Sequence, residues 1–98
     1  MAIESFKNQV IESINNGEVT KRTRKILPVE LHQKAQIKLA RIGAATNLKD
    51  LSQLKGNNLE ALKGDREGQF SVRINDQYRI CFEWNNNNAD NVEITDYH

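Results

Sequence analysis

The last third of the chain constrains the fold most strongly, because apolar side chains recur there at every second position. Phe70, Val72 and Ile74 alternate with polar residues, and the same alternation runs through residues 78–84 and 92–95. A period of two is typical of strands that bury one face. Since the connections between these three runs are short and polar, we expect an antiparallel three-stranded meander with one apolar face.

The apolar pattern also predicts the register of the first hairpin in this meander. A two-residue turn would place Val72 opposite Arg79 and mix apolar with charged side chains on one face. Pairing Ile74 with Tyr78 instead places Val72 opposite Ile80 and brings the large apolar side chains of both strands to one face, which is the condition that specifies register. We therefore expect a three-residue turn, a length that usually carries a bulge.

This register sets Arg73 directly opposite Arg79 on the other face of the sheet. Like charges at directly opposed positions are destabilising. Two interpretations remain open at this point. Either each arginine is paired with a nearby acid, or the two arginines form a preformed anion site on the open face of the sheet. The nearby acids include Asp65, Glu67 and Glu93.

The first half of the chain has the spacing of helices. An apolar cluster at residues 10–14 recurs at helical intervals, and the Asn and Gly residues that follow it are a stop signal. Beyond Pro28, four apolar residues at steps of four, four and three form one face of a longer helix that ends near Gly43. The four are Leu31, Ala35, Leu39 and Ile42. With a short strand at residues 2–6, the expected order is an N-terminal strand and two helices, then the meander, in the α+β class.

Length and composition predict one small domain that spans residues 1–98. The chain has no run of 18 apolar residues, and its N-terminus lacks a basic segment followed by an apolar stretch, so we expect neither a membrane span nor a signal peptide. The single cysteine, Cys81, cannot form an internal disulfide. We expect it to pack as a small apolar side chain in a protein of the reducing cytoplasm.

Charge is sorted along the chain. Residues 1–79 hold all 14 lysines and arginines and nine of the 13 acids, whereas residues 80–98 hold four acids and no basic residue. Such sorting favours an anionic partner, although on composition alone a solvated surface with uneven charge explains it better. One basic group is a run at residues 21–25, and a second is a stripe on the long helix, where His32 is also expected at the surface. The stripe comprises Lys34, Lys38 and Arg41.

Two short segments carry side chains suited to chemistry on a phosphate backbone. The chain ends on Asp96, Tyr97 and His98, which follow the last predicted strand directly. A strand would hold in place a chain end that otherwise frays. The second segment, at residues 62–68, is a charged loop with two glycines that includes Lys63 and Arg66. Together these segments indicate a small nuclease.

These segments, with the strand sequences Ser71-Val72-Arg73-Ile74-Asn75 and Tyr78-Arg79-Ile80-Cys81-Phe82, resemble the HigB toxins. HigB toxins are the plasmid maintenance killer branch of the RelE/ParE superfamily. The resemblance is close over residues 60–98 and looser before them. It implies a compact RelE-like α+β fold and the activity of a ribosome-dependent mRNA endonuclease. It also implies neutralisation by a helix-turn-helix antitoxin of the HigA type, through which alone operator DNA is contacted.

The resemblance also implies which side chains act at the cut site. In the family these are the terminal Asp-Tyr-His, the lysine of the Lys-Gly-Asp loop and the strand arginines. In this chain the positions are Asp96, Tyr97, His98, Lys63, Arg73 and Arg79. The chain departs from some members at Glu60, where they have a histidine three residues before the loop lysine. Glu60 is therefore either a general base or a structural residue.

Since no cluster in the sequence has metal-ligand spacing, we expect metal-free and cofactor-free cleavage in which the 2′-OH of the RNA attacks the adjacent phosphorus. His98 is the best candidate for the general acid, because imidazole alone has an unperturbed pKa near neutrality. Asp96 would orient it or act as base, Tyr97 would stack on a base or position the phosphate, and the loop lysine and strand arginines would neutralise the phosphorane. The run Lys21, Arg22, Arg24 and Lys25, the helical stripe and Arg66 are expected to contact mRNA or ribosomal RNA.

Two other functions remain open. The ParE branch shares the fold and poisons DNA gyrase without cutting RNA, which the terminal Asp96-Tyr97-His98 argues against. The other is a module that binds an antitoxin but has lost catalysis, which the departure at Glu60 keeps open.

Overall fold

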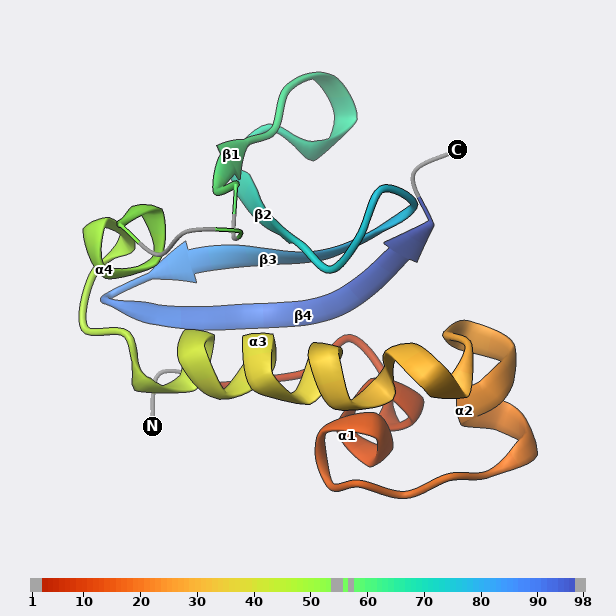
Figure 1. Cartoon of the computed structure of the whole chain (residues 1–98). Coiled ribbons are helices and arrows are strands. Elements are labelled where there is room, and N and C mark those ends of the chain that lie inside the picture. The colour runs from red at the N-terminus through yellow and green to blue at the C-terminus, as the bar shows by residue number, and fades with distance from the viewer. Residues whose placement is uncertain (1–2, 54–55, 57, 97–98) are drawn as a thin grey trace.

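The computed structural model describes residues 3–53, 56 and 58–96, and it places a layer of helices against one face of a four-stranded antiparallel sheet (Figure 1). The α+β class is confirmed. The helices are α1 (Gln9–Asn15), α2 (Lys21–Ile26), α3 (His32–Ala44) and α4 (Leu48–Ser52), with 3-10 turns at Val29–Leu31 and Gly64–Arg66. The strands are β1 (Glu60–Ala61), β2 (Gln69–Arg73), β3 (Tyr78–Asn85) and β4 (Asn88–Asp96), adjacent in chain order. Within the described ranges, no helix is long and apolar enough to cross a membrane.

The predicted register of the β2–β3 hairpin is confirmed. Val72 lies opposite Ile80, and Arg73 lies opposite Arg79. The backbone N–H of Ile74 donates to the carbonyl of Tyr78 over 2.9 Å, so the turn has the expected three residues. The apolar members of both strands therefore face the helices, and the two arginines share the opposite face.

The sheet differs from the expected meander at both of its ends. The two residues of β1 pair with β2 and add a fourth strand, which the sequence did not predict because a two-residue exposed strand has no alternation to detect. At the N-terminus, Ile3 and Phe6 form only isolated parallel bridges to Ala89 and Val92 of β4, rather than a strand. Met1 and Ala2 of the expected strand lie outside the described residues.

The short polar connection expected between β3 and β4 is confirmed, and its four consecutive asparagines make a tight turn. Asn85 and Asn88 pair as the last rung of the ladder, and between them Asn86 and Asn87 have φ of 52° and 63°. Two central residues with positive φ are the requirement of a type I′ hairpin turn, and asparagine tolerates this conformation better than most residues. A bulge at Asn91, with φ of 51°, then shifts the β3–β4 register by one residue.

The described residues form four helices rather than the two expected, because the basic run at residues 21–25 is itself helical, as α2, and because α4 follows α3. Thr20 and Thr23 form a reciprocal capping box at the start of α2, which satisfies backbone donors that the first turn leaves open. Helix α1 begins at the cap of Asn8, which accepts a hydrogen bond from Ile11. The core lies between α1, α3 and the sheet, and its largest fully buried side chains include Phe82, Leu39, Ile42 and Ile14.

Two residues expected on the surface of α3 are buried. His32 is 4% exposed, and its Nε2 lies 2.8 Å from the carbonyl oxygen of Leu27. Lys38 is 5% exposed and donates to the carbonyl oxygen of Gly56 over 3.0 Å. The physical reason is helical spacing, since residues three or four apart share a face of a helix. His32 lies three residues before the buried Ala35, and Lys38 lies three residues after Ala35, so both belong to the buried face of α3.

Alanine substitution of Leu39 should destabilise the fold, because this fully buried side chain packs in the core between α3 and the sheet. We expect Leu39→Ala to lower the free energy of unfolding by about 2–5 kcal/mol. Ile37→Ala is the matched control on the same helix, since Ile37 is 47% exposed, and should change stability by less than about 0.5 kcal/mol. Urea unfolding of both variants measures the difference, and equal losses would contradict the assignment of the buried face.

Candidate functional site

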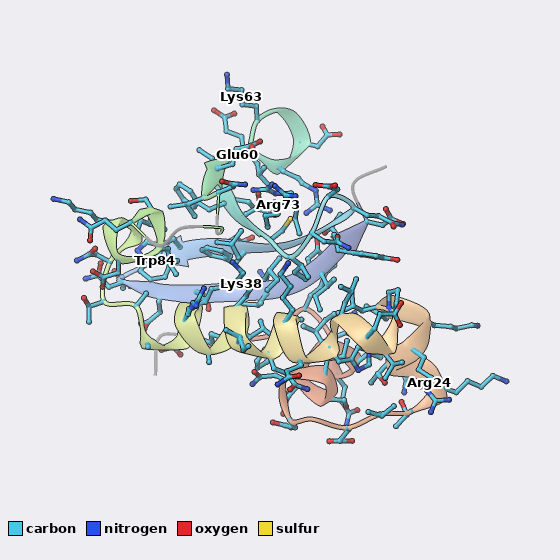
Figure 2. All side chains as sticks on the ribbon, in the orientation of Figure 1. Arg24, Lys38, Glu60, Lys63, Arg73 and Trp84 are labelled. Carbon is cyan, nitrogen blue, oxygen red and sulfur yellow. The ribbon has the colours of Figure 1, made fainter. Side chains whose placement is uncertain are left out.

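The face of the sheet away from α3 carries a compact set of polar side chains. Directly paired residues in an antiparallel sheet share a face, so Glu60, Ser71, Cys81 and Glu93 form one row across all four strands. Arg73, Arg79 and Thr95 form the next row. We refer to these two rows as the open face. Figure 2 shows Glu60, Lys63 and Arg73 on this side of β3, whereas Lys38 lies toward α3.

Arg79 is held across the open face by neutral oxygen atoms. Its Nε donates to Ser71 Oγ over 2.7 Å, and its Nη2 donates to the carbonyl oxygen of Asn58 over 2.6 Å. Ser71 is fully buried, so its hydroxyl is a fixed acceptor. Two bonds to different groups restrict both the position and the plane of the guanidinium. These two partners orient the guanidinium of Arg79 but do not neutralise its charge.

Arg73 has an acidic partner, but not one of the three named from the sequence. Its Nη2 forms an ion pair with Asp76 of the β2–β3 turn. The side chain of Asp76 is 94% exposed and that of Arg73 is 40% exposed. Exposed ion pairs contribute little to stability and exchange readily with solvent. The guanidinium of Arg73 is therefore accessible to an anionic ligand.

Glu60 of β1 and Lys63 of the following loop are both exposed. Lys63 directly precedes the 3-10 turn at Gly64–Arg66, and Gly64 has φ of 66°, which favours glycine. A hollow of about 490 Å³ is lined by Glu60, Lys63 and Arg66, together with Ala61 and Leu62. The structure thus places the expected loop lysine and the divergent glutamate at one polar surface.

Arg66, expected to contact RNA, has an internal partner. Its Nη1 donates to Glu93 Oε1 over 2.6 Å and to Gln69 Oε1 over 3.0 Å. The other carboxylate oxygen of Glu93 accepts from Lys7 Nζ over 2.7 Å. Glu93 is 8% exposed, so this buried carboxylate joins the N-terminal segment, the loop and β4. RNA contact by Arg66 stays a prediction.

Two opposing effects set the pKa of Glu93. Desolvation by burial raises it, but the hydrogen bonds and positive charges of Lys7 and Arg66 outweigh burial and hold the pKa below its ordinary value. For Cys81, on the same row, burial is the main cause and raises the thiol pKa. Cys81 is fully buried, which confirms its expected packing. Glu93 is therefore ionised at neutral pH, and Cys81 is not.

The C-terminal site residues are only partly described. Asp96 lies opposite Tyr78 at the end of β4, where Gln77 Nε2 donates to its Oδ2 over 3.1 Å. Because side chains alternate along β4, Asp96 lies on the same face of the sheet as Ile94. Thr95 lies on the open face, and Asp96 does not. Tyr97 and His98 lie outside the described residues, and their roles stay predictions.

The basic surfaces of the helices lie apart from the open face. In Figure 2, Arg24 projects from α2 on the helical side of the molecule, far from Lys63. The four basic residues Lys21, Arg22, Arg24 and Lys25 are all exposed. The prediction of a basic stripe on α3 is wrong at its central residue, because Lys38 is buried. The other two residues of the stripe, Lys34 and Arg41, are exposed. Burial, and next the charges of Arg41, Lys34 and Arg73, lower the pKa of Lys38.

Two supporting groups of the site were not found from the sequence: Ser71 and the backbone of Asn58, which orient Arg79. Glu93 was named from the sequence as a possible partner of the strand arginines, but it pairs with Arg66. The register alone would have placed Ser71 and Glu93 on the open face. Which partner each takes depends on side-chain reach across three strands, and no pattern in the sequence encodes that reach.

Comparison with known proteins gives consistent matches over nearly the whole chain. A family model described as the RelE-like toxin of the type II toxin-antitoxin system HigB matches residues 4–98. Toxin HigB-1 of Vibrio cholerae is 31% identical over 97 residues, which cover 99% of this chain and 94% of that toxin. Endoribonuclease HigB of Proteus vulgaris is 30% identical over 96 residues, which cover 98% of this chain and 99% of that enzyme.

The stability that Glu93 contributes should depend on pH. A carboxyl with a lowered pKa in the folded chain stabilises the fold above its unfolded-state pKa, and this contribution is lost as the pH falls through the folded-state pKa. Glu93→Gln should therefore lower the free energy of unfolding at neutral pH by about 1–3 kcal/mol, because it leaves the charges of Lys7 and Arg66 less well satisfied. The deficit should close as the pH falls below 4.5, the ordinary value for this group.

Urea unfolding of the wild type and Glu93→Gln at a series of pH values measures this deficit, because the other carboxylates titrate alike in both proteins and cancel. A deficit that stays constant from neutral into acid pH would contradict the ionised, paired state of Glu93.

Proposed function

Since this chain belongs to the HigB-like family of RelE-like type II toxins, in which endoribonuclease activity is found, we propose that it is a ribosome-dependent mRNA endonuclease that inhibits translation. The observation that carries the proposal is the pair Arg73 and Arg79, opposed on the open face, with Arg73 in an exposed ion pair and Arg79 oriented by neutral oxygen atoms. A sheet that places like charges in direct opposition is suited to bind a phosphate.

The proposed cleavage needs no metal. A base takes the proton of the ribose 2′-OH, and the 2′-oxygen attacks the adjacent phosphorus. The bond from phosphorus to the 5′-oxygen then breaks, and an acid protonates the leaving oxygen. The products are a 2′,3′-cyclic phosphate and a free 5′-hydroxyl. The phosphorane between these steps carries extra negative charge, and preorganised cations stabilise it most effectively in a site from which water is excluded.

Each predicted residue has a role in this scheme. Lys63, Arg73 and Arg79 neutralise the phosphorane. His98 protonates the leaving oxygen, since its unperturbed pKa lies near neutrality. Asp96 orients His98 or competes with Glu60 as the base, and Tyr97 positions the phosphate or stacks on a base of the RNA. The position of Glu60 on the row of Ser71, beside the arginines, supports its candidacy.

The partners follow from the family and from the charge distribution. As a type II toxin, the protein has an antitoxin partner, which we propose to be a helix-turn-helix protein of the HigA type that contacts operator DNA for the complex. The exposed basic residues of α2 contact ribosomal RNA, at a surface separate from the cutting site. The protein acts in the cytoplasm, where translating ribosomes are found.

The experiment that tests the proposed function is primer extension on an abundant transcript after a short induced pulse of the protein. Wild type is compared with a version that ends at Tyr97. We expect new 5′ ends within translated regions only, and their loss without His98. Growth arrest with intact messages would overturn the proposal and point instead to a protein target such as DNA gyrase.

Replacing Arg73 by lysine should impair cleavage although the charge is kept. A lysine ammonium cannot form the bidentate fork that a guanidinium offers to phosphate, and removing one preorganised group aimed at developing charge costs about 10²- to 10³-fold in rate. The matched control is Arg41→Lys on the exposed surface of α3, which keeps the charge that a salt-dependent phosphate interaction requires. Near-normal toxicity of Arg73→Lys at matched expression would refute this role.

Neutralising the start of α2 should weaken ribosome binding. The double variant Lys21→Gln/Arg22→Gln removes two exposed charges from a helix N-terminus, where cations are unfavourable, so the helix itself is not destabilised. We expect weaker co-sedimentation with ribosomes. The salt dependence of binding should also become shallower, by about one unit of slope for each side chain that no longer binds a phosphate.

The control for this variant is Lys34→Gln/Arg41→Gln, which removes the same charge from the exposed surface of α3. It should have the smaller effect, because the buried Lys38 interrupts that surface. Co-sedimentation of the α2 variant that equals wild type would reject the docking role of α2.

A further inference from the structure

We propose that Glu93 is a positioning residue, which holds the Lys63–Arg66 loop at the cutting site through its ion pair with Arg66. The inference rests on the proposed nuclease function for its effect on cleavage, and on the geometry of three chain segments for its structural part.

The carboxylate of Glu93 is fully engaged by groups from different segments. Arg66 Nη1 and Lys7 Nζ bind separate oxygens at 2.6 and 2.7 Å, and Thr95 Oγ1 donates to the Oε1 atom over 3.3 Å. The side chain of Glu93 is 11% exposed, compared with 34% for Arg66 and 59% for Lys7. A buried carboxylate with two cationic partners is a fixed anchor, because separation of either pair leaves a charge poorly solvated.

The loop that Glu93 anchors contains two glycines. Gly64 begins the 3-10 turn and Gly68 follows it, and both have positive φ, at 66° and 93°. Glycine reaches many backbone conformations at low cost, so the local sequence does not define one loop position. Backbone hydrogen bonds close the base of the loop, where Leu62 N donates to Gln69 O of β2 over 2.9 Å, and shape its turn, where Glu67 N donates to Gly64 O over 3.1 Å. Neither of these bonds reaches β3 or β4.

Arg66 connects the turn of the loop to the far side of the sheet. It reaches from the loop between β1 and β2 to Glu93 on β4, which is two strands beyond β2. On the way it also donates to Gln69 Oε1 at the start of β2, over 3.0 Å. The arginine therefore fixes the loop against the open face, and Lys63 precedes the fixed turn directly.

Lys7 completes the anchor from the opposite side. Its backbone N–H donates to the carbonyl oxygen of Val92 over 2.9 Å, which holds the N-terminal segment beside β4. Its ammonium then satisfies the second carboxylate oxygen of Glu93, the one that Arg66 does not bind. The position of Glu93 is thereby set independently of the loop, as an anchor requires.

Loss of the anchor should affect turnover rather than ribosome binding, because Glu93 acts on RNA only through the loop. Small misplacement of a catalytic group is sufficient to reduce a rate by about 10²-fold. Glu93→Gln should thus lower kcat for cleavage on programmed ribosomes by at least about tenfold and leave KM unchanged. Arg66→Gln should lower kcat in the same way from the other side of the pair; since Arg66 is also predicted to contact RNA, the comparison between the two variants uses kcat alone.

Epistasis with Lys63 distinguishes positioning from general destabilisation. If Glu93 acts through Lys63, the double variant Lys63→Met/Glu93→Gln cleaves no more slowly than Lys63→Met alone, whereas a separate structural effect would multiply the two losses. Glu93→Asp, which keeps the carboxylate, should recover part of the activity. The matched control is Glu83→Gln, which removes a carboxylate from the same face that accepts a hydrogen bond from Asn91 rather than from the loop.

Amide hydrogen exchange of wild type and Glu93→Gln tests the anchor without RNA. We expect faster exchange at Leu62, Arg66 and Glu67 in the variant, while amides of β3 stay protected. Unchanged loop exchange, or multiplied rate losses in the double variant, would overturn the inference. Faster loop exchange in a protein whose wild type cuts no message would support the anchor and overturn the proposed nuclease function instead.

Discussion

The register of β2 against β3 is the constraint on which the rest of the structure depends. Because side chains alternate strictly between the faces of a sheet, packing Val72, Ile80 and Phe82 against the helices determines what the other face carries. A slip of one residue would bury both arginines and expose the core. Burial of apolar side chains on one face of the sheet thus sets Arg73 directly opposite Arg79 on the other face.

The charged residues of the open face have partners of different kinds. Arg73 pairs with an exposed acid of the adjacent turn, whereas Arg79 donates to a buried hydroxyl and a backbone carbonyl that carry no net charge. The buried acid of the face, Glu93, is engaged by Arg66 and Lys7. The negative charge of Glu93 is therefore balanced by two cations other than the opposed arginines.

The fold of residues 69–96 could be predicted largely from the sequence, because periodic packing against one apolar layer leaves few alternatives. Prediction was wrong where the outcome depended on a rotation or a local cap. His32 and Lys38 are buried because they lie one turn from Ala35 on the packed face of α3. The basic run at residues 21–25 is helical, with a capping box at Thr20. Of the site, the arginines and their face were predicted. Their partners were not, since hydrogen bonds across three strands depend on three-dimensional reach rather than on spacing.

The most direct test of the central claim is a paired measurement on Arg73→Gln, with ribosome-dependent cleavage and the free energy of unfolding determined on the same preparation. If Arg73 is kept for phosphate binding, cleavage should fall by about 10²-fold or more. Stability should change by no more than about 0.5 kcal/mol, or rise, because the exposed pair with Asp76 contributes little and repulsion from Arg79 is relieved. Normal cleavage with a large loss of stability would show instead that Arg73 is a structural residue and that the open face is not the cutting site.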